Sequence, residues 1–197
     1  MKVANLSSAA GLSDPGSPDW QGLGSETVAL SPVPLEAQSN AYIQESWSGK
    51  EYGKTPEVRV VAASGGGRLY IRLEWSDDVK DHGEFKDAAG ALFPINGGGA
   101  LATLGSAESP LAIWFWEDGR PAGLSLKATG PGVFRREEGG DLAATGTLND
   151  GTWSVVFEGP ADVASRGSLG VAVWNGSNDE RAGLAAVSRD WLALEME

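Results

Sequence analysis

Residues 68–75 alternate strictly between apolar and polar side chains. Leu69, Ile71, Leu73 and Trp75 fall on one set of alternate positions, and Tyr70, Arg72 and Glu74 fall on the other. Residues two apart point to the same face of a strand, so this pattern predicts a β-strand with one buried face. No stretch repeats apolar residues every 3.6 positions over a useful length. Together with 28 glycines and 10 prolines, the pattern predicts an all-β protein with many tight turns.

Similar reasoning gives the other strands. We expect them at 27–30, 57–63, 88–94, 124–128, 133–136, 142–148, 153–158, 168–174 and 187–194, with one more strand that contains Trp114 and Trp116. Pro32 and Pro34 favour an edge position for 27–30, and Asp150-Gly151 predicts a hairpin turn. Residues 38–54 show no period and predict a long loop, while 160–167 predict one short helical turn. The expected fold is an antiparallel β-sandwich of about ten strands.

The length of 197 residues fits one domain with a core of its own. Residues 1–25 are rich in Ser, Gly, Asp and Pro and predict an extended arm, either mobile or lying across another subunit. Residues 26–197 are expected to form the β-sandwich domain. The N-terminal segment has no apolar block typical of a signal peptide, which predicts a cytoplasmic protein; export together with a signal-bearing partner is the alternative.

The amino-acid composition excludes several kinds of functional site and argues against some partners. The absence of cysteine excludes disulfides, thiolate metal sites and a cysteine nucleophile. A net charge of −12, with 15 scattered basic residues, argues against a nucleic acid or an anionic membrane as the partner. With a single histidine and no GxSxG motif, the usual nucleophilic constellations are missing. We therefore expect a chain that binds or carries something and is not itself an enzyme.

Trp114 and Trp116 stand two residues apart on an expected strand and share one face. The two indoles either fill the core of the sandwich or form an aromatic wall against which a flat group lies. With Glu117, Asp118 and Arg120 close by, such a wall would suit stacking on a sugar ring. A carbohydrate-binding module is therefore the alternative hypothesis for function.

Four segments in order, RLYIRLEWSDD, DAAGALFP, TLGSAESPLAIWFWEDGRP and GSLGVAVWNGSNDERAGLAAVS, resemble landmarks of the γ subunits of the ethylbenzene dehydrogenase and dimethylsulfide dehydrogenase group. The resemblance covers residues 27–197. It implies a β-sandwich that binds one haem b and accompanies a molybdenum-containing α subunit and an iron–sulfur β subunit. It also implies an electron relay from molybdenum through the iron–sulfur clusters to the haem, or the reverse in a reductase.

The resemblance further implies two axial haem ligands: a methionine before the glycine of the TLGS-like turn and a lysine in the segment matching ERAGLAAVS. Leu104 and Ala185 occupy these positions, and neither side chain can coordinate iron. By the resemblance, the haem pocket would lie between 100–116 and 181–188, at Leu104, Trp114, Trp116 and Ala185. The sequence offers these other ligands: Lys80, His82, Lys86, Lys127 and Met196.

The sequence leaves two states open, loss of the haem or recruitment of new ligands. Our leading hypothesis is a non-catalytic γ-type subunit, haem-binding by ancestry, that covers and positions the iron–sulfur subunit. The substrate of the complex and the direction of electron flow are not encoded in any motif of this chain.

Overall fold

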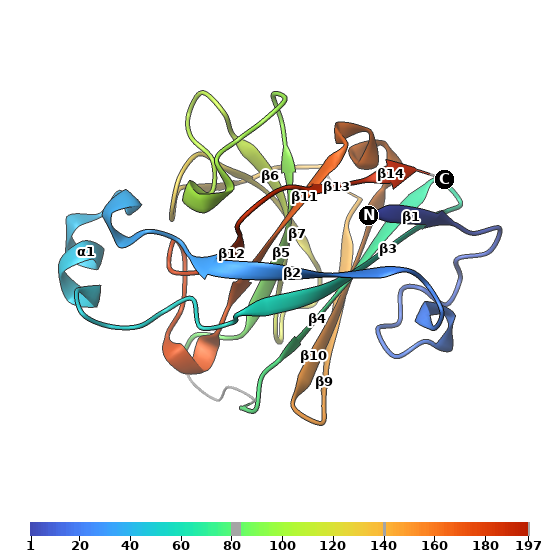
Figure 1. Ribbon diagram of the computed structural model, residues 1–197, viewed down its shortest axis with the longest axis horizontal. Helices are drawn as coiled ribbons and strands as arrows, with labels where there is room; N and C mark the ends of the chain where they lie inside the picture. The colour runs from blue at the N-terminus through green and yellow to red at the C-terminus, as the bar shows by residue number, and fades with distance from the viewer. Residues whose placement is uncertain (80–83, 140, 197) are drawn as a thin grey trace.

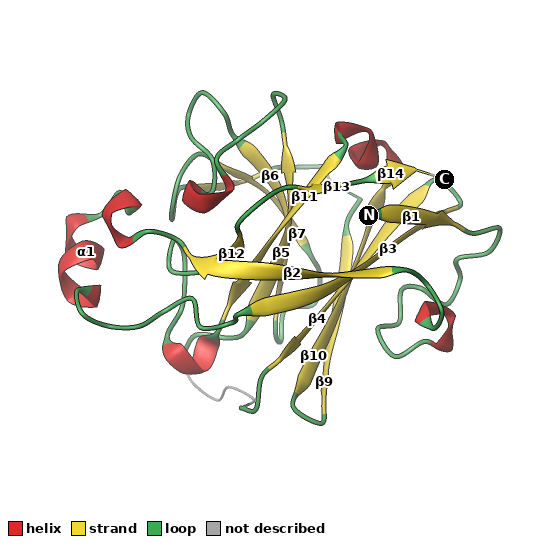
Figure 2. Ribbon diagram, in the orientation of Figure 1, coloured by secondary structure: helices red, strands yellow, loops and turns green. Residues whose placement is uncertain are grey.

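The computed structural model describes residues 1–79, 84–139 and 141–196, and most of its regular structure is β-strand (Figures 1 and 2). The strands are β1 (Lys2–Asn5), β2 (Ser25–Pro32), β3 (Glu57–Gly65), β4 (Arg68–Ser76), β5 (Ala88–Pro94), β6 (Leu111–Glu117), β7 (Leu124–Ala128), β8 (Phe134–Arg136), β9 (Ala143–Asn149), β10 (Thr152–Pro160), β11 (Ser168–Trp174), β12 (Ala186–Ser188), β13 (Leu192–Ala193) and β14 (Glu195–Met196). The helices are α1 (Ala41–Trp47) and the 3-10 helices η1 (Pro18–Trp20), η2 (Leu35–Ala37), η3 (Leu101–Thr103), η4 (Ala161–Arg166) and η5 (Gly176–Asn178).

The strands form one hydrogen-bonded path in the order β8-β7-β6-β5-β11-β12-β2-β3-β4-β10-β9. All pairs along this path are antiparallel, whereas β1 pairs in parallel with β3 and β14. The path passes from one layer to the other within β2, whose residues 30–32 pair with β12 and whose residues 25–29 pair with β3, so its two halves form the two layers of a sandwich (Figure 1). The predicted fold class is confirmed, with 14 strands in the described residues because β1, β13 and β14 are too short to show alternation.

Apolar side chains form three clusters. The largest lies between the layers and contains Trp114 and Trp116 together with Trp75 and Trp153. The Trp116 and Trp153 rings are 4.9 Å apart between centroids, and Trp75 stacks on Trp153 at 6.2 Å. A second cluster includes the other side chains of β5, β6 and β11, on the outer face of the layer that these strands form. A third covers the outer face of β3, β4 and β10.

The first 24 residues cover this third face instead of extending from the domain as an arm. β1 pairs with the end of β3, and the buried Leu12 and Trp20 pack in one cluster with Tyr70 and Val156. The Ser13 hydroxyl donates to the Glu158 carboxylate at 2.6 Å. Because β3 is apolar on both faces over much of its length, its outer face needs such a cover.

Three other expectations differ from the structure. Residues 38–54 contain α1, which begins where the Asn40 side chain accepts a hydrogen bond from the Tyr42 amide, and which stands off to one side of the sandwich (Figure 1). β2 is an inner strand between β12 and β3, because its prolines fall at or beyond its end. The expected final strand is divided into β12 and β13.

No helix in the described residues has the length and hydrophobicity that crossing a membrane requires.

The indoles of β6 reach the backbone of the opposite layer. A Cβ added to Gly146 would overlap Cζ2 of Trp116, and one added to Gly159 would overlap Cζ2 of Trp114. We predict that Gly146→Ala and Gly159→Ala each lower the free energy of unfolding by about 1–3 kcal/mol, measured by urea denaturation, because the indoles must shift. Gly24→Ala is the control, since a Cβ there meets nothing within 4 Å. Variants at 146 and 159 as stable as the control would contradict this packing.

Candidate functional site

Leu104 follows η3 with its backbone in the left-handed region, at φ 50° and ψ 42°. The next residue, Gly105, has φ 84°, and a Cβ there would lie 3.0 Å from the Ser109 carbonyl oxygen and 3.1 Å from that of Ala128. Only glycine fits this second position without strain. The turn directs the Leu104 side chain into the second cluster, where it is fully buried.

Ala185 immediately precedes β12, and its carbonyl oxygen accepts a hydrogen bond from the Val33 amide at 2.9 Å. Its side chain is also fully buried and belongs to the same cluster as Leu104. The other buried members of this cluster are Val33, Ala88, Leu92, Leu101, Leu111, Ile113, Ala128, Ala172, Trp174 and Val187. The structure thus brings the two ligand positions implied by the resemblance into one apolar cluster.

Trp114 and Trp116 lie elsewhere. Alternation along β6 sends them to the inner cluster, whereas Ile113 and Phe115 point to the outer face, towards Leu104 and Ala185. Trp114 and Trp116 are 5% and 3% exposed, so the first interpretation of the two indoles, as core residues, describes them. Neither indole stands out from the surface as an aromatic wall.

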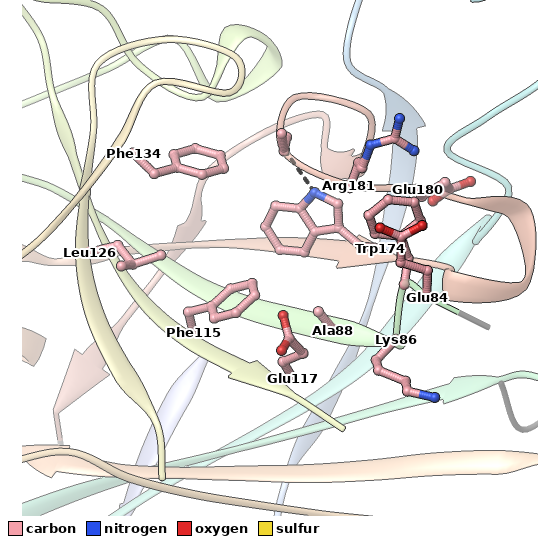
Figure 3. Close-up of a pocket in the computed structure, with 12 residues that line it drawn as sticks. Glu84, Lys86, Ala88, Phe115, Glu117, Leu126, Phe134, Trp174, Glu180 and Arg181 are labelled. Carbon is pink, nitrogen blue, oxygen red and sulfur yellow. Dashed lines mark hydrogen bonds between the residues drawn. The ribbon is translucent and has the colours of Figure 1, made fainter. Parts of the chain in front are cut away.

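A pocket of about 260 Å³ opens on the outer face, beside the second cluster (Figure 3). Phe115, Phe134 and Trp174 form its aromatic wall, with the Trp174 ring centroid 5.5 Å from that of Phe115 and 6.4 Å from that of Phe134. The Trp174 indole donates to the Ala182 carbonyl oxygen at 2.9 Å, which ties the wall to the 180–184 loop. At the rim, the Arg181 guanidinium lies 4.1 Å from the Phe85 ring centroid. The sequence patterns did not predict this pocket; Phe115, which lies between two inward tryptophans, was the available signal.

Buried carboxyl groups hold the loop after β11. Asp87 accepts hydrogen bonds from the Trp153 indole at 2.9 Å and the Gly176 amide at 3.0 Å. Asp77 accepts from the Asn175 side chain at 3.1 Å. Burial raises the pKa of Asp77, the Val79 amide opposes this, and the neighbouring Asp87 raises it further. Burial likewise raises the pKa of Glu180, although that carboxylate accepts from the Asn175 amide at 3.0 Å.

The residues present do not fit a haem held by the ligands that the resemblance implies, because both positions carry hydrocarbon side chains. Of the other candidates, Lys86 lies at the pocket rim, Lys127 lines a different hollow beside Trp114, and Met196 is half-exposed on β14. Lys80 and His82 lie outside the described residues. Among the described residues, no three His, Cys, Asp or Glu side chains gather in a way that could hold a metal ion.

Comparison with known proteins identifies the relatives. No protein-family model matches the chain. It is 34% identical over 157 residues to the chlorate reductase subunit gamma of Ideonella dechloratans, and the match covers 71% of this chain and 65% of the relative. It is 30% identical over 151 residues to the dimethylsulfide dehydrogenase subunit gamma of Rhodovulum sulfidophilum, covering 66% and 56%. The chain is similar to these γ subunits over about two thirds of its own length. The resemblance found in its sequence is confirmed.

A third relative, from Haloferax mediterranei, is named as a respiratory nitrate reductase heme subunit. It is 33% identical over 151 residues, and the match covers 68% of this chain and 54% of the relative. The chain therefore spans between about half and two thirds of the lengths of these relatives. All three relatives are named as gamma or heme subunits of a reductase or a dehydrogenase, which is the class of subunit that the resemblance implies.

A solved structure shares the fold. The family 9 carbohydrate-binding module of Caldicellulosiruptor kristjanssonii, in complex with glucose, superposes with a TM-score of 0.53 over all of this chain and 95% of that chain, at 10% identity. A likeness at this level of identity concerns the fold alone.

The Asp87 carboxyl is expected to stabilise the fold through its two buried donors. We predict that Asp87→Ala lowers the free energy of unfolding by about 2–5 kcal/mol, because the Trp153 indole and the Gly176 amide then lose their acceptor. Asp162→Ala, which removes an exposed carboxylate from η4, should change it by less than about 0.5 kcal/mol. Chemical denaturation at neutral pH measures both variants, and equal effects would contradict the prediction.

The raised pKa of Asp77 gives a pH dependence with a definite sign. The unfolded chain ionises near the ordinary aspartate value of about 3.9, and the folded chain ionises at higher pH. As pH rises through this interval, Asp77 becomes charged first in the unfolded chain and its contribution turns destabilising. Asn at position 77 keeps an acceptor for Val79 and removes the charge. We predict that the free energy of unfolding of Asp77→Asn, minus that of the wild type, increases between pH 4 and pH 7; a constant or falling difference would contradict it.

Proposed function

We propose that this chain is a γ-type subunit of a molybdenum and iron–sulfur oxidoreductase complex, in which it covers and positions the iron–sulfur subunit without binding haem at the family positions. Its relatives support the first part, because they are named as gamma or heme subunits of a chlorate reductase, a nitrate reductase and a dimethylsulfide dehydrogenase. The second part departs from them and stands on the chain's own residues.

The observation that carries the proposal is the pair Leu104 and Ala185. Haem iron takes histidine, methionine, cysteine or tyrosine ligands, and in this family, by the resemblance, lysine. Both positions carry hydrocarbon side chains that are fully buried in one cluster with other apolar residues. The residues at these positions thus pack as core.

A carbohydrate-binding role has no comparable support. The two indoles that suggested it are buried between the layers, and the shared fold with a glucose-bound module says nothing of ligand. We therefore do not propose it.

The native complex provides the test. We expect purification of this chain from its source to yield larger partner chains that carry iron–sulfur clusters and molybdenum. We also expect no b-type α band after dithionite reduction, and no haem in a pyridine haemochrome assay attributable to this chain. One haem per copy would overturn the haem-free assignment and direct attention to Lys80 and His82. A preparation without iron–sulfur partners would overturn the subunit assignment.

Substitutions at the two positions distinguish a packed core from a vacant haem slot. We predict that Leu104→Met costs less than about 1.5 kcal/mol of unfolding free energy, because the volumes are similar. Ala185→Lys should cost about 3–5 kcal/mol, because an unpaired ammonium would be buried among hydrocarbon. Urea denaturation, with and without added hemin, measures both. A stable Ala185→Lys chain, or a double variant that acquires a haem Soret band, would show that a slot for haem persists there.

A further inference from the structure

The hydrogen-bonded path ends at two edge strands with opposite character. β8 has three residues, two of them the exposed Arg135 and Arg136, and the charged Glu137 and Glu138 follow directly. β9 has seven residues, AATGTLN, with no charge and no proline, and it pairs with β10 in unbroken register. Natural sheets usually protect their edges with charges, prolines, bulges or short strands. β8 has this protection and β9 lacks it.

The hairpin register shows which groups of β9 are available. Asp150 and Gly151 form a two-residue turn with positive φ at both positions, and Asn149 pairs with Thr152 across it. This closing pair is hydrogen-bonded, so alternation makes Thr147, Thr145 and Ala143 the next hydrogen-bonded positions. The N–H and C=O groups of the intervening residues, Ala144, Gly146 and Leu148, therefore point away from β10, along the free edge.

Charge near this edge is negative. Asp141 precedes β9 and accepts a hydrogen bond from the Arg68 guanidinium at 2.6 Å, and the exposed Asp150 follows β9. A hollow of about 450 Å³ lies beside the start of the strand, lined by the carboxylates of Glu137, Glu138, Asp141 and Asp162 against the two cations Lys127 and Arg166. An extended segment lying along β9 would meet carboxylates at both of its ends.

We propose that β9 is a docking edge to which the partner subunit adds a β-strand, with uncharged β-branched residues at its centre and lysine or arginine at its ends. This inference rests on the proposed function, because it names the surface by which the chain holds its partner. A second copy of this chain suits the edge less well. Two antiparallel β9 strands would bring Asp141 of each chain towards Asp150 of the other, between molecules that each carry a net charge of −12.

Amide hydrogen exchange is measured on the free 197-residue chain and on the native complex. In the free chain we expect fast exchange at Ala144, Gly146 and Leu148, and protection at Thr145 and Thr147, which bond to β10. In the complex, exchange at the first three should slow by at least about a hundredfold. A stoichiometric complex with unchanged exchange at these amides would overturn the docking edge and leave the subunit role intact. Absence of any complex would overturn both.

Two variants at one position test the contact directly. Ala144→Pro removes an outward N–H, a substitution that edge strands tolerate, whereas Ala144→Ser keeps the N–H. In reconstitution of the purified complex we expect the proline variant to bind its partner at least about tenfold more weakly than the serine variant, at equal thermal stability. Equal binding by the two would overturn the proposal. Slow exchange at the outward amides of the free chain, together with concentration-dependent self-association in sedimentation velocity, would assign the edge to a second copy. That result would equally overturn the proposal.

Discussion

The packing of two indoles against two glycines fixes the relation between the layers of this sandwich. Trp114 and Trp116 extend from β6 across the core, and their rings end against the backbone at Gly159 and Gly146. Because glycine has no Cβ, the indole edge and the opposite strand approach as closely as packing allows. A slip of one residue in β6 would place Ile113 and Phe115 in the core and both indoles outside. The same alternation builds the outer pocket, since Phe115 reaches it only while its two neighbours point inward.

Local sequence patterns were sufficient for the regular part of the fold. Period-two alternation and glycine-rich turns give the all-β class, and the bounds expected at 88–94, 124–128 and 168–174 are those of β5, β7 and β11. The failures have two physical causes, and the first is burial against a partner distant in sequence. Leu12 and Trp20 are isolated apolar residues in a polar segment, and only the apolar outer face of β3 and β4 gives them a place. The seven residues of α1 span too few turns to show a helical period.

The candidate site was predicted in part. The resemblance singled out Leu104 and Ala185, and the structure brings them into one cluster although they are 81 positions apart in the chain. It also singled out Trp114 and Trp116, which lie on the opposite face of the same layer. Alternation alone states which residues share a face and leaves open which face meets the ligand positions. That choice depends on where η3 and the 180–185 loop return over the sheet, a long-range property of the topology.

The backbone at Leu104 bears on how a γ-type chain could remain folded without the cofactor. Leu104 lies in the left-handed region, a conformation that costs a non-glycine residue roughly 1–2 kcal/mol. The next residue in this turn, Gly105, also has a positive φ. A fully buried leucine side chain contributes a similar or larger amount through removal of apolar surface from water, so burial offsets the strain. A bound cofactor stabilises the fold only while it is present, whereas Leu104 and Ala185 stabilise this cluster at all times. In the haem-free role that we propose, hydrocarbon side chains at the ligand positions would supply the stability that a cofactor otherwise supplies, and the turn at Leu104 would fill the core.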